Sequence, residues 1–139
     1  MEQKKQRRKS RKTCLQALYS NDVAGVSINQ ILDGSATLPH VEELDQYSRN
    51  LIKGTTAHSE EIDKRLASVS KNWALGRMSS TDRCLLRQTV FEMIYVDDVP
   101  ISVSINEAVE LAKEYGGEDD SHKFVNGVLG KIARDLENE

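Results

Sequence analysis

The chain has 139 residues, of which 38% are hydrophobic and 29% are charged, and it contains only two prolines. This length suits one domain with a single core and is too short for a catalytic domain together with an accessory one. No apolar run approaches the roughly 18 to 20 residues that a membrane-spanning helix needs, and no signal-peptide stretch follows the basic N-terminus. We therefore expect one domain, residues 1–139, in the cytoplasm.

The formal net charge of −3 conceals two regions of opposite sign. Residues 1–12 hold seven basic side chains and one acidic side chain, a net charge of +6, whereas the other residues hold 12 basic and 21 acidic ones, a net charge of −9. A basic arm on an acidic body is typical of proteins that bind a polyanion, because each neutralised phosphate releases counterions. The alternative is a solvated, disordered tail that helps solubility.

Helical spacing begins next to this arm. The first predicted helix, at about residues 8–21, has Cys14, Ala17, Leu18 and Asn21 in the i, i+3, i+4, i+7 spacing of one helical face. Gly25 ends this helix, and Ser27 with Gln30 is typical of the start of a second, short helix, which Gly34 can end. The basic arm is therefore predicted to lead directly into a helix.

The middle of the chain is predicted to be helical between short loops. After a loop at residues 33–40, helical spacing runs from Val41 to Val69, with room for a bend at residues 54–58. We expect a short helical turn at residues 73–78 and a longer helix at about residues 81–96. Asp97, Asp98 and Pro100 then break the chain before the next helix.

Two further helices complete the pattern. One runs from about Ile105 to Tyr115 and is closed by Gly116 and Gly117. Acceptors for the start of the last helix come from Asp119, Asp120 and Ser121, and its apolar face comprises Val125, Val128, Leu129, Ile132 and Leu136. Because no segment shows sustained strand alternation, the sequence predicts an all-α protein, a compact bundle of six to seven helices.

Motifs of catalysis and metal binding are absent from the sequence. Neither glycine-rich nucleotide-binding pattern occurs, and the histidines at positions 40, 58 and 122 have no ligand spacing. Cys14 and Cys84 lack CxxC spacing, so we interpret them as small buried hydrophobic side chains. We expect no cofactor, no metal ion and no enzymatic activity.

Two surface features are suited to binding RNA. A strip on the first helix, beside the core face, comprises Arg8, Lys12, Leu15 and Tyr19. Phe124 is predicted to lie beside the apolar face of the last helix, next to Lys123. Single-stranded RNA is held by cations on its backbone and aromatic faces under its bases. The alternative is that Tyr19 is a core-edge side chain and Phe124 an ordinary boundary hydrophobic residue.

Three segments of the sequence resemble the NusB family. They are CLQALYS at residues 14–20, INEAVELAKEYG at residues 105–116 with Val99-Pro100 before it, and SHKFVNGVL at residues 121–129. The segments occur in the family's order over nearly the whole chain, and the two C-terminal ones are the more specific. The resemblance implies a fold of two three-helix subdomains, no cofactor, and a role in processive transcription antitermination, especially on ribosomal RNA operons.

The resemblance also implies partners and contact residues. Proteins of this kind pair with NusE, a small-subunit ribosomal protein, and the pair binds the single-stranded boxA element of nascent RNA within the RNA polymerase antitermination complex. The matching RNA-binding positions are Arg7, Arg8 and Arg11 in the arm, and Asp120, Lys123 and Phe124 at the start of the last helix. Tyr19 and Asp82 match positions that face NusE.

Two other functions stay open. A NusB-like domain also precedes some RNA methyltransferase domains, so the chain could be a stand-alone RNA-targeting piece of such an enzyme. It could also be a protein-interaction helical bundle whose basic arm is incidental.

Overall fold

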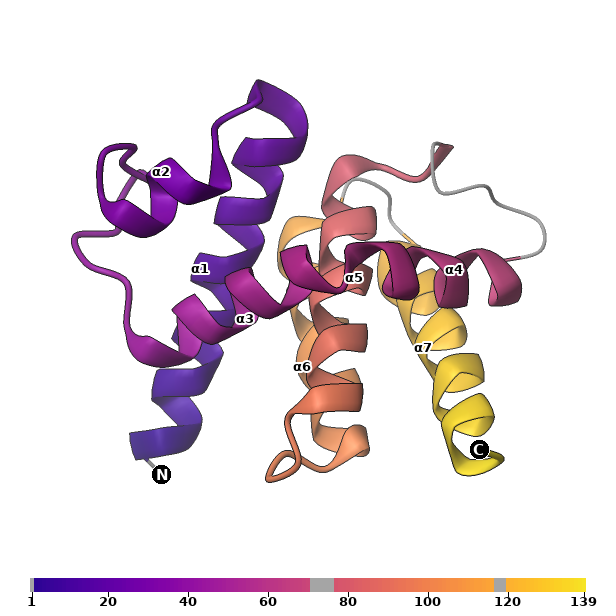
Figure 1. Cartoon of the computed structure of the whole chain (residues 1–139). Coiled ribbons are helices and arrows are strands. Elements are labelled where there is room, and N and C mark those ends of the chain that lie inside the picture. The colour runs from indigo at the N-terminus through magenta and orange to yellow at the C-terminus, as the bar shows by residue number, and fades with distance from the viewer. Residues whose placement is uncertain (1, 71–76, 117–119) are drawn as a thin grey trace.

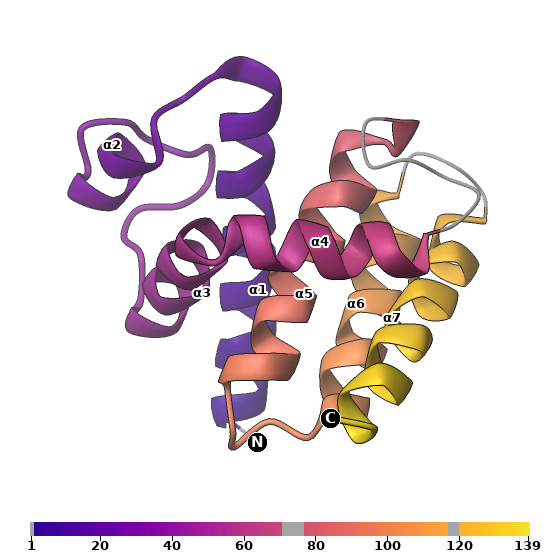
Figure 2. The ribbon, with the colours of Figure 1, turned by 45° about the vertical axis from the view of Figure 1, so that its right-hand side comes forward.

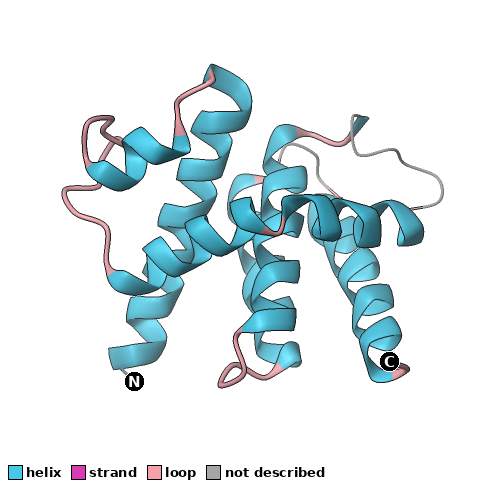
Figure 3. Cartoon of the chain, in the orientation of Figure 1, coloured by secondary structure: helices cyan, strands magenta, loops and turns pink. Residues whose placement is uncertain are grey.

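The computed structural model describes residues 2–70, 77–116 and 120–139, and within these ranges the protein is built from helices (Figures 1 and 3). The helices are α1 (Glu2–Ala24), α2 (Ile28–Asp33), α3 (Gln46–Ala57), α4 (Ser59–Val69), α5 (Ser80–Tyr95), α6 (Ile101–Tyr115) and α7 (Ser121–Glu137). Over the described ranges no strand forms; a lone bridge joins Leu38 to Val41. The prediction of an all-α protein with six to seven helices is confirmed.

Helix α5 lies at the centre of the bundle and packs against α1, α3, α4, α6 and α7. Helices α1, α2 and α3 form one group, whereas α5, α6 and α7 form another, with α4 laid across α5 and α7 (Figures 1 and 2). Because its neighbours surround it, α5 is apolar on more than one face: Leu85, Leu86 and Val90 are all fully buried. One continuous core therefore joins the two groups of helices.

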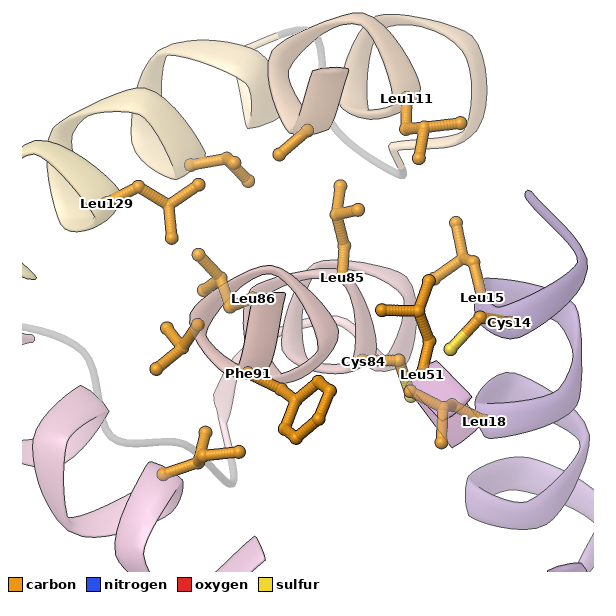
Figure 4. Packing of buried hydrophobic residues seen from close by; sticks show 14 of the residues in the cluster. Cys14, Leu15, Leu18, Leu51, Cys84, Leu85, Leu86, Phe91, Leu111 and Leu129 are labelled. Carbon is orange, nitrogen blue, oxygen red and sulfur yellow. The ribbon is translucent and has the colours of Figure 1, made fainter. Parts of the chain in front are cut away.

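The two cysteines face each other within this core. Figure 4 shows Cys14 of α1 and Cys84 of α5 among Leu18, Leu51 and Leu85. Both are free and buried, as the sequence predicted. Burial raises the pKa of the Cys14 thiol well above its ordinary value and that of Cys84 to about 11. Both side chains therefore stay protonated at neutral pH and act as small hydrophobic groups.

Local capping signals fix the ends of the early helices. The Ser27 side chain accepts a hydrogen bond from the Gln30 amide at the start of α2, and Gly34 ends that helix with φ of 86°. A left-handed residue at this position suits glycine, which has no Cβ to clash. The predicted short helix is confirmed, and so is the bend at residues 54–58, where His58 separates α3 from α4.

Three predicted helix starts were wrong, one of them that of α6, which begins at Ile101 directly after Pro100 and not at about Ile105. Helix α3 begins at Gln46 and not at Val41, because the Asp45 carboxylate accepts the Ser48 amide 2.8 Å away and caps the helix there. Helix α1 begins at Glu2, so the basic arm is helical and the alternative of a disordered tail does not describe residues 2–12. The turn predicted at residues 73–78 falls mostly outside the described residues.

Four helix ends lie towards the same end of the bundle, the upper end in Figure 1: the C-terminal ends of α1 and α6 and the N-terminal ends of α5 and α7, with the end of α1 standing apart from the other three. The N-terminal half of α1 lies at the opposite end, beside the start of α6. None of the helices in the described part of the chain is long and apolar enough to cross a membrane.

Candidate nucleic-acid interface

The three arginines of the basic arm bind carboxylates of the protein itself. The Nη2 atom of Arg7 lies 2.9 Å from the Asp98 carboxylate, in the loop between α5 and α6. Arg8 donates two hydrogen bonds of 3.0 Å to Glu107 of α6. These bonds from Arg8 hold the pKa of the Glu107 carboxyl below its ordinary value. The arm is thus fastened along the body of the protein.

Arg11 makes the innermost of these contacts. Its Nε lies 2.9 and 3.1 Å from the two carboxylate oxygens of Glu92 on α5, and its Nη1 lies 3.4 Å from Glu107. Arg11 is only 6% exposed and Glu92 only 2%. A pair of buried charges is tolerable only when further hydrogen bonds satisfy its remaining polar atoms.

Two hydroxyl groups supply those hydrogen bonds to Glu92. The Ser104 hydroxyl donates over 2.7 Å, and the Tyr47 hydroxyl donates to the other oxygen. Burial and the nearby Glu92 carboxylate raise the pKa of Tyr47 well above its ordinary value. The Arg7 guanidinium lies over the Tyr47 ring, 4.4 Å from its centroid. Helices α1, α3, α5 and α6 therefore share one buried polar network.

This network changes the role expected of Arg11. The resemblance placed Arg11 among the RNA-binding residues, but in this structure its guanidinium is enclosed between α5 and α6 and paired with Glu92 and Glu107. The side chains of Arg7 and Arg8 are 21% and 50% exposed, so both lie at the surface while engaged in their ion pairs. Contacts of the three arginines with RNA stay a prediction, and for Arg11 a contact would require its buried ion pairs to open.

A groove of about 840 Å³ runs along the outer side of α1. One wall is the exposed face of α1, with Lys9, Lys12 and Tyr19, and the other includes residues 39–43; Tyr115 at the end of α6 also lines it. The sequence indicated the α1 side of this groove but missed the other residues. No binding motif marks them in the sequence, because residues 39–43 lie where a predicted loop passes into helical spacing.

The start of α7 presents the second predicted RNA-binding group. The Asp120 carbonyl accepts the amides of Lys123 and Phe124 over 3.0 and 3.1 Å, so all three residues form one turn. The exposed Lys123 Nζ lies 3.6 Å from the Asp120 carboxylate. Phe124 is half-buried and packs against the core from outside it. The structure thus brings a cation, a carboxylate and a fixed aromatic ring together.

The two predicted partner-facing residues differ in exposure. Tyr19 is 43% exposed and lies outside the core, which argues against the core-edge alternative. Val23, one turn further along α1, is 54% exposed. Asp82 is instead 6% exposed, and its carboxylate accepts a hydrogen bond from the Ser121 hydroxyl over 3.1 Å. Asp82 joins the start of α5 to the start of α7, so its side chain does not lie on the open surface.

A family model described as the NusB family matches residues 8–134 of the chain. The chain belongs to the NusB family. It is 42% identical to the transcription antitermination protein NusB of Halalkalibacterium halodurans over 90% of this chain and 91% of that protein. It is 38% identical to the NusB of Bacillus subtilis over 94% of this chain and 97% of that protein.

Solved NusB structures share the fold. A NusB of T. maritima superposes with a TM-score of 0.80 at 34% identity, covering 93% of this chain and 91% of that one. A NusB chain crystallised as antitermination factors NusB and NusE in complex with dsRNA superposes with a TM-score of 0.73 at 27% identity, covering 93% of this chain and 96% of that one.

Membership of the NusB family assigns the chain to transcription antitermination proteins. NusB antitermination factors are non-enzymatic, so function resides in binding surfaces and not in a catalytic centre. The matched relatives are named transcription antitermination proteins, which favours this function over the targeting role of a methyltransferase domain.

Proposed function

We propose that this NusB-family protein binds single-stranded RNA of boxA type together with NusE, the small-subunit ribosomal protein, as part of the RNA polymerase antitermination complex on ribosomal RNA operons in the cytoplasm. The solved NusB–NusE assembly with dsRNA supports the two classes of partner. The proposal adds that the protein prefers the boxA sequence to other single-stranded RNA.

The observation that carries the RNA part is the turn that begins α7. Phe124 is anchored on one side by the core, so it offers its remaining surface to an unstacked base with little loss of side-chain freedom. Lys123 beside it supplies a cation for a phosphate, and the exposed Asp120 carboxylate can accept hydrogen bonds from base amino groups. Cation, acceptor and aromatic ring are the groups by which proteins hold single-stranded RNA.

The protein-partner part rests on the C-terminal half of α1. Tyr19 and Val23 are exposed and share one side of the helix, so they form a small apolar surface at the end of the bundle where α7 begins. Exposed aromatic side chains at such surfaces contribute much of the affinity for a protein partner. Asp82 supports this arrangement from inside, because its bond to Ser121 holds the start of α7 in place.

The proposal is tested by titrating a labelled single-stranded boxA RNA, and a scrambled RNA of equal length, with wild-type protein and with Phe124→Ala. Loss of a stacking platform costs about 1 to 3 kcal/mol per base, a loss of affinity of roughly fivefold to 150-fold, without altering the number of ions released. We expect this loss with boxA RNA, at an unchanged salt dependence. Tyr95→Ala, which removes a 40% exposed aromatic ring from α5, is the matched control.

Two results would contradict the proposal. Equal affinity of the wild-type protein for boxA and scrambled RNA would remove the sequence preference. A Phe124→Ala variant that folds and binds boxA RNA as tightly as the wild type would remove the stacking role of Phe124.

A further inference from the structure

The exposed side of α1 carries a straight line of lysines. At 100° per residue, positions 5, 9, 12, 16, 19 and 23 all lie within about 40° of one line along the helix. Lys5, Lys9 and Lys12 occupy the first half of this line, and Tyr19 and Val23 occupy the second half. We refer to these three lysines as the lysine strip.

Two ammonium groups of the lysine strip, those of Lys5 and Lys9, are more available than the guanidinium groups of Arg7, Arg8 and Arg11, each of which is held in an ion pair. Lys5 and Lys9 are exposed, and within the described part of the chain neither forms an ion pair. Lys12 lies 3.4 Å from Glu114, with both side chains at least 40% exposed. Ion pairs exposed to solvent contribute only about 0 to 1 kcal/mol, so a phosphate can displace Glu114 from Lys12 at little cost.

Arg8 and Arg11 would lose much more on turning to RNA. Arg8 would give up two hydrogen bonds to Glu107, whose carboxylate is 9% exposed and would then keep only the 3.4 Å contact with Arg11. Arg11 would leave both Glu92 and Glu107 without their charged partner. The arginines of α1 therefore fasten the helix to the rest of the protein, whereas Lys5, Lys9 and Lys12 face the solvent.

The surroundings of the lysine strip favour one path for a strand of RNA. Lys9, Lys12 and Tyr19 form one wall of the 840 Å³ groove, whereas the opposite wall carries the exposed carboxylates of Glu42 and Glu43. Phosphates are repelled by that wall, so the backbone must follow the lysine side with the bases towards the groove. The line leads past Tyr19 to the end of the bundle where α7 begins (Figure 1).

We propose that the lysine strip of α1, and not the arginines beside it, is the phosphate-binding track of the arm, while Arg7, Arg8 and Arg11 are clamps that hold α1 on the body. This inference rests on the proposed RNA-binding function. It assigns RNA contacts to Lys5, Lys9 and Lys12.

The test compares three variants in RNA titrations at several salt concentrations, with thermal unfolding of each variant measured in parallel. Binding to single strands changes with a logarithmic salt slope of about −0.7 per phosphate neutralised. The variant K5Q/K9Q/K12Q should flatten the slope by up to about two units and leave the melting temperature nearly unchanged. The variant R7Q/R8Q should lower the melting temperature while its slope stays close to that of the wild type.

The third variant, K53Q/K64Q/K131Q, is the charge-matched control, because it removes three exposed lysines from α3, α4 and α7. It should keep the wild-type slope. If the lysine-strip variant keeps the wild-type slope, or if folded R7Q/R8Q flattens the slope as much, the division of roles is wrong. Either of these results counts against the division of roles when the wild-type protein binds RNA. A wild type that binds no RNA would instead overturn the proposed function.

Discussion

The guanidinium group of Arg11 and the carboxylate of Glu92 form a buried ion pair at the centre of the bundle, with Nε 2.9 and 3.1 Å from the two carboxylate oxygens. The pair joins the basic arm to the central helix. Removing one member of a buried pair leaves the other charge without compensation and costs about 3 to 5 kcal/mol. We predict this loss of unfolding free energy for Arg11→Met in urea denaturation.

Arg8→Met is the matched control for that measurement. Arg8 binds the same α6 carboxylate that Arg11 reaches, but its side chain is half exposed and Arg11 would still reach Glu107, so its loss should cost less than that of Arg11, about 1 to 3 kcal/mol. Equal, small losses for both variants would show that the buried network does not hold α1 on the body.

Gly54 of α3 faces the ring of Phe91, and a Cβ atom at this position would overlap that ring. Phe91 is buried and its ring lies against both His58 and Tyr95, with centroids 5.9 and 5.3 Å away, so it has little room to move. Gly54→Ala should therefore lower the unfolding free energy, although alanine favours a helix by about 1 kcal/mol.

Substitution of Gly127 on α7 should have the opposite effect on stability. Nothing lies within 4 Å of a Cβ atom built there, so Gly127→Ala should raise the unfolding free energy by up to about 1 kcal/mol. Thermal and urea unfolding of the two variants check both signs. A stabilising effect at Gly54 would show that α3 and α5 do not pack as closely as described.

The start of α3 should show a specific pH dependence. Burial alone would raise the pKa of Asp45, but hydrogen bonds from Ser10, Ser48 and Gln6 outweigh it and lower the pKa from 3.8 to about 2. A carboxyl whose pKa is lowered by folding adds stability above its unfolded pKa, and this contribution is lost as the pH falls through the folded value. The relevant window is therefore between about pH 4 and pH 2.

Asp45→Ala measures this contribution. At neutral pH the variant should be less stable by about 0.5 to 2 kcal/mol, the usual cost of losing a helix cap. The difference from the wild type should shrink as the pH falls from about 4 towards 2, because the wild-type carboxyl becomes protonated there. A difference that does not depend on pH over this range would rule out the charged cap.

Features that depend on neighbouring residues were predictable from the sequence. Ser27, Gln30 and Gly34 lie within one short segment, and their capping geometry is determined there. The start of α3 was misplaced because Val41 and Leu44 contact the core from a loop, which produced helical spacing without a helix. Asp45, with Ser48 three residues later, was the local signal that marks the true start.

The roles of charged residues in the site were less predictable, because they depend on partners distant in the sequence. Arg11 looks like its neighbours in the arm, and only the fold brings Glu92, 81 residues later, against it. Asp82 is enclosed by the fold, which brings the Ser121 hydroxyl, 39 residues later, within hydrogen-bonding distance of its carboxylate. The sequence also left the exposure of Tyr19 open, because a place beside the apolar face of α1 suits an exposed side chain and a core-edge one alike.

Tyr19 and Asp82 should therefore respond differently to substitution. Tyr19→Ala should weaken NusE binding by about 1 kcal/mol or more, at least roughly fivefold, while unfolding free energy changes by about 0.5 kcal/mol or less. Asp82→Ala should lower the unfolding free energy by about 1 to 3 kcal/mol, because it removes a buried acceptor. Calorimetric titration with NusE and urea denaturation separate the two effects; a Tyr19→Ala variant that mainly unfolds would restore the core-edge interpretation.

Joint binding of RNA and NusE by this protein is tested by measuring its affinity for boxA RNA with and without saturating NusE. We predict tighter RNA binding in the presence of NusE, and by thermodynamic linkage RNA must tighten NusE binding by the same factor. NusE should tighten the binding of a scrambled RNA of equal length by a smaller factor. If NusE leaves the affinity for boxA RNA unchanged, or if the protein binds neither partner, the account of this surface as a joint RNA and protein interface is contradicted.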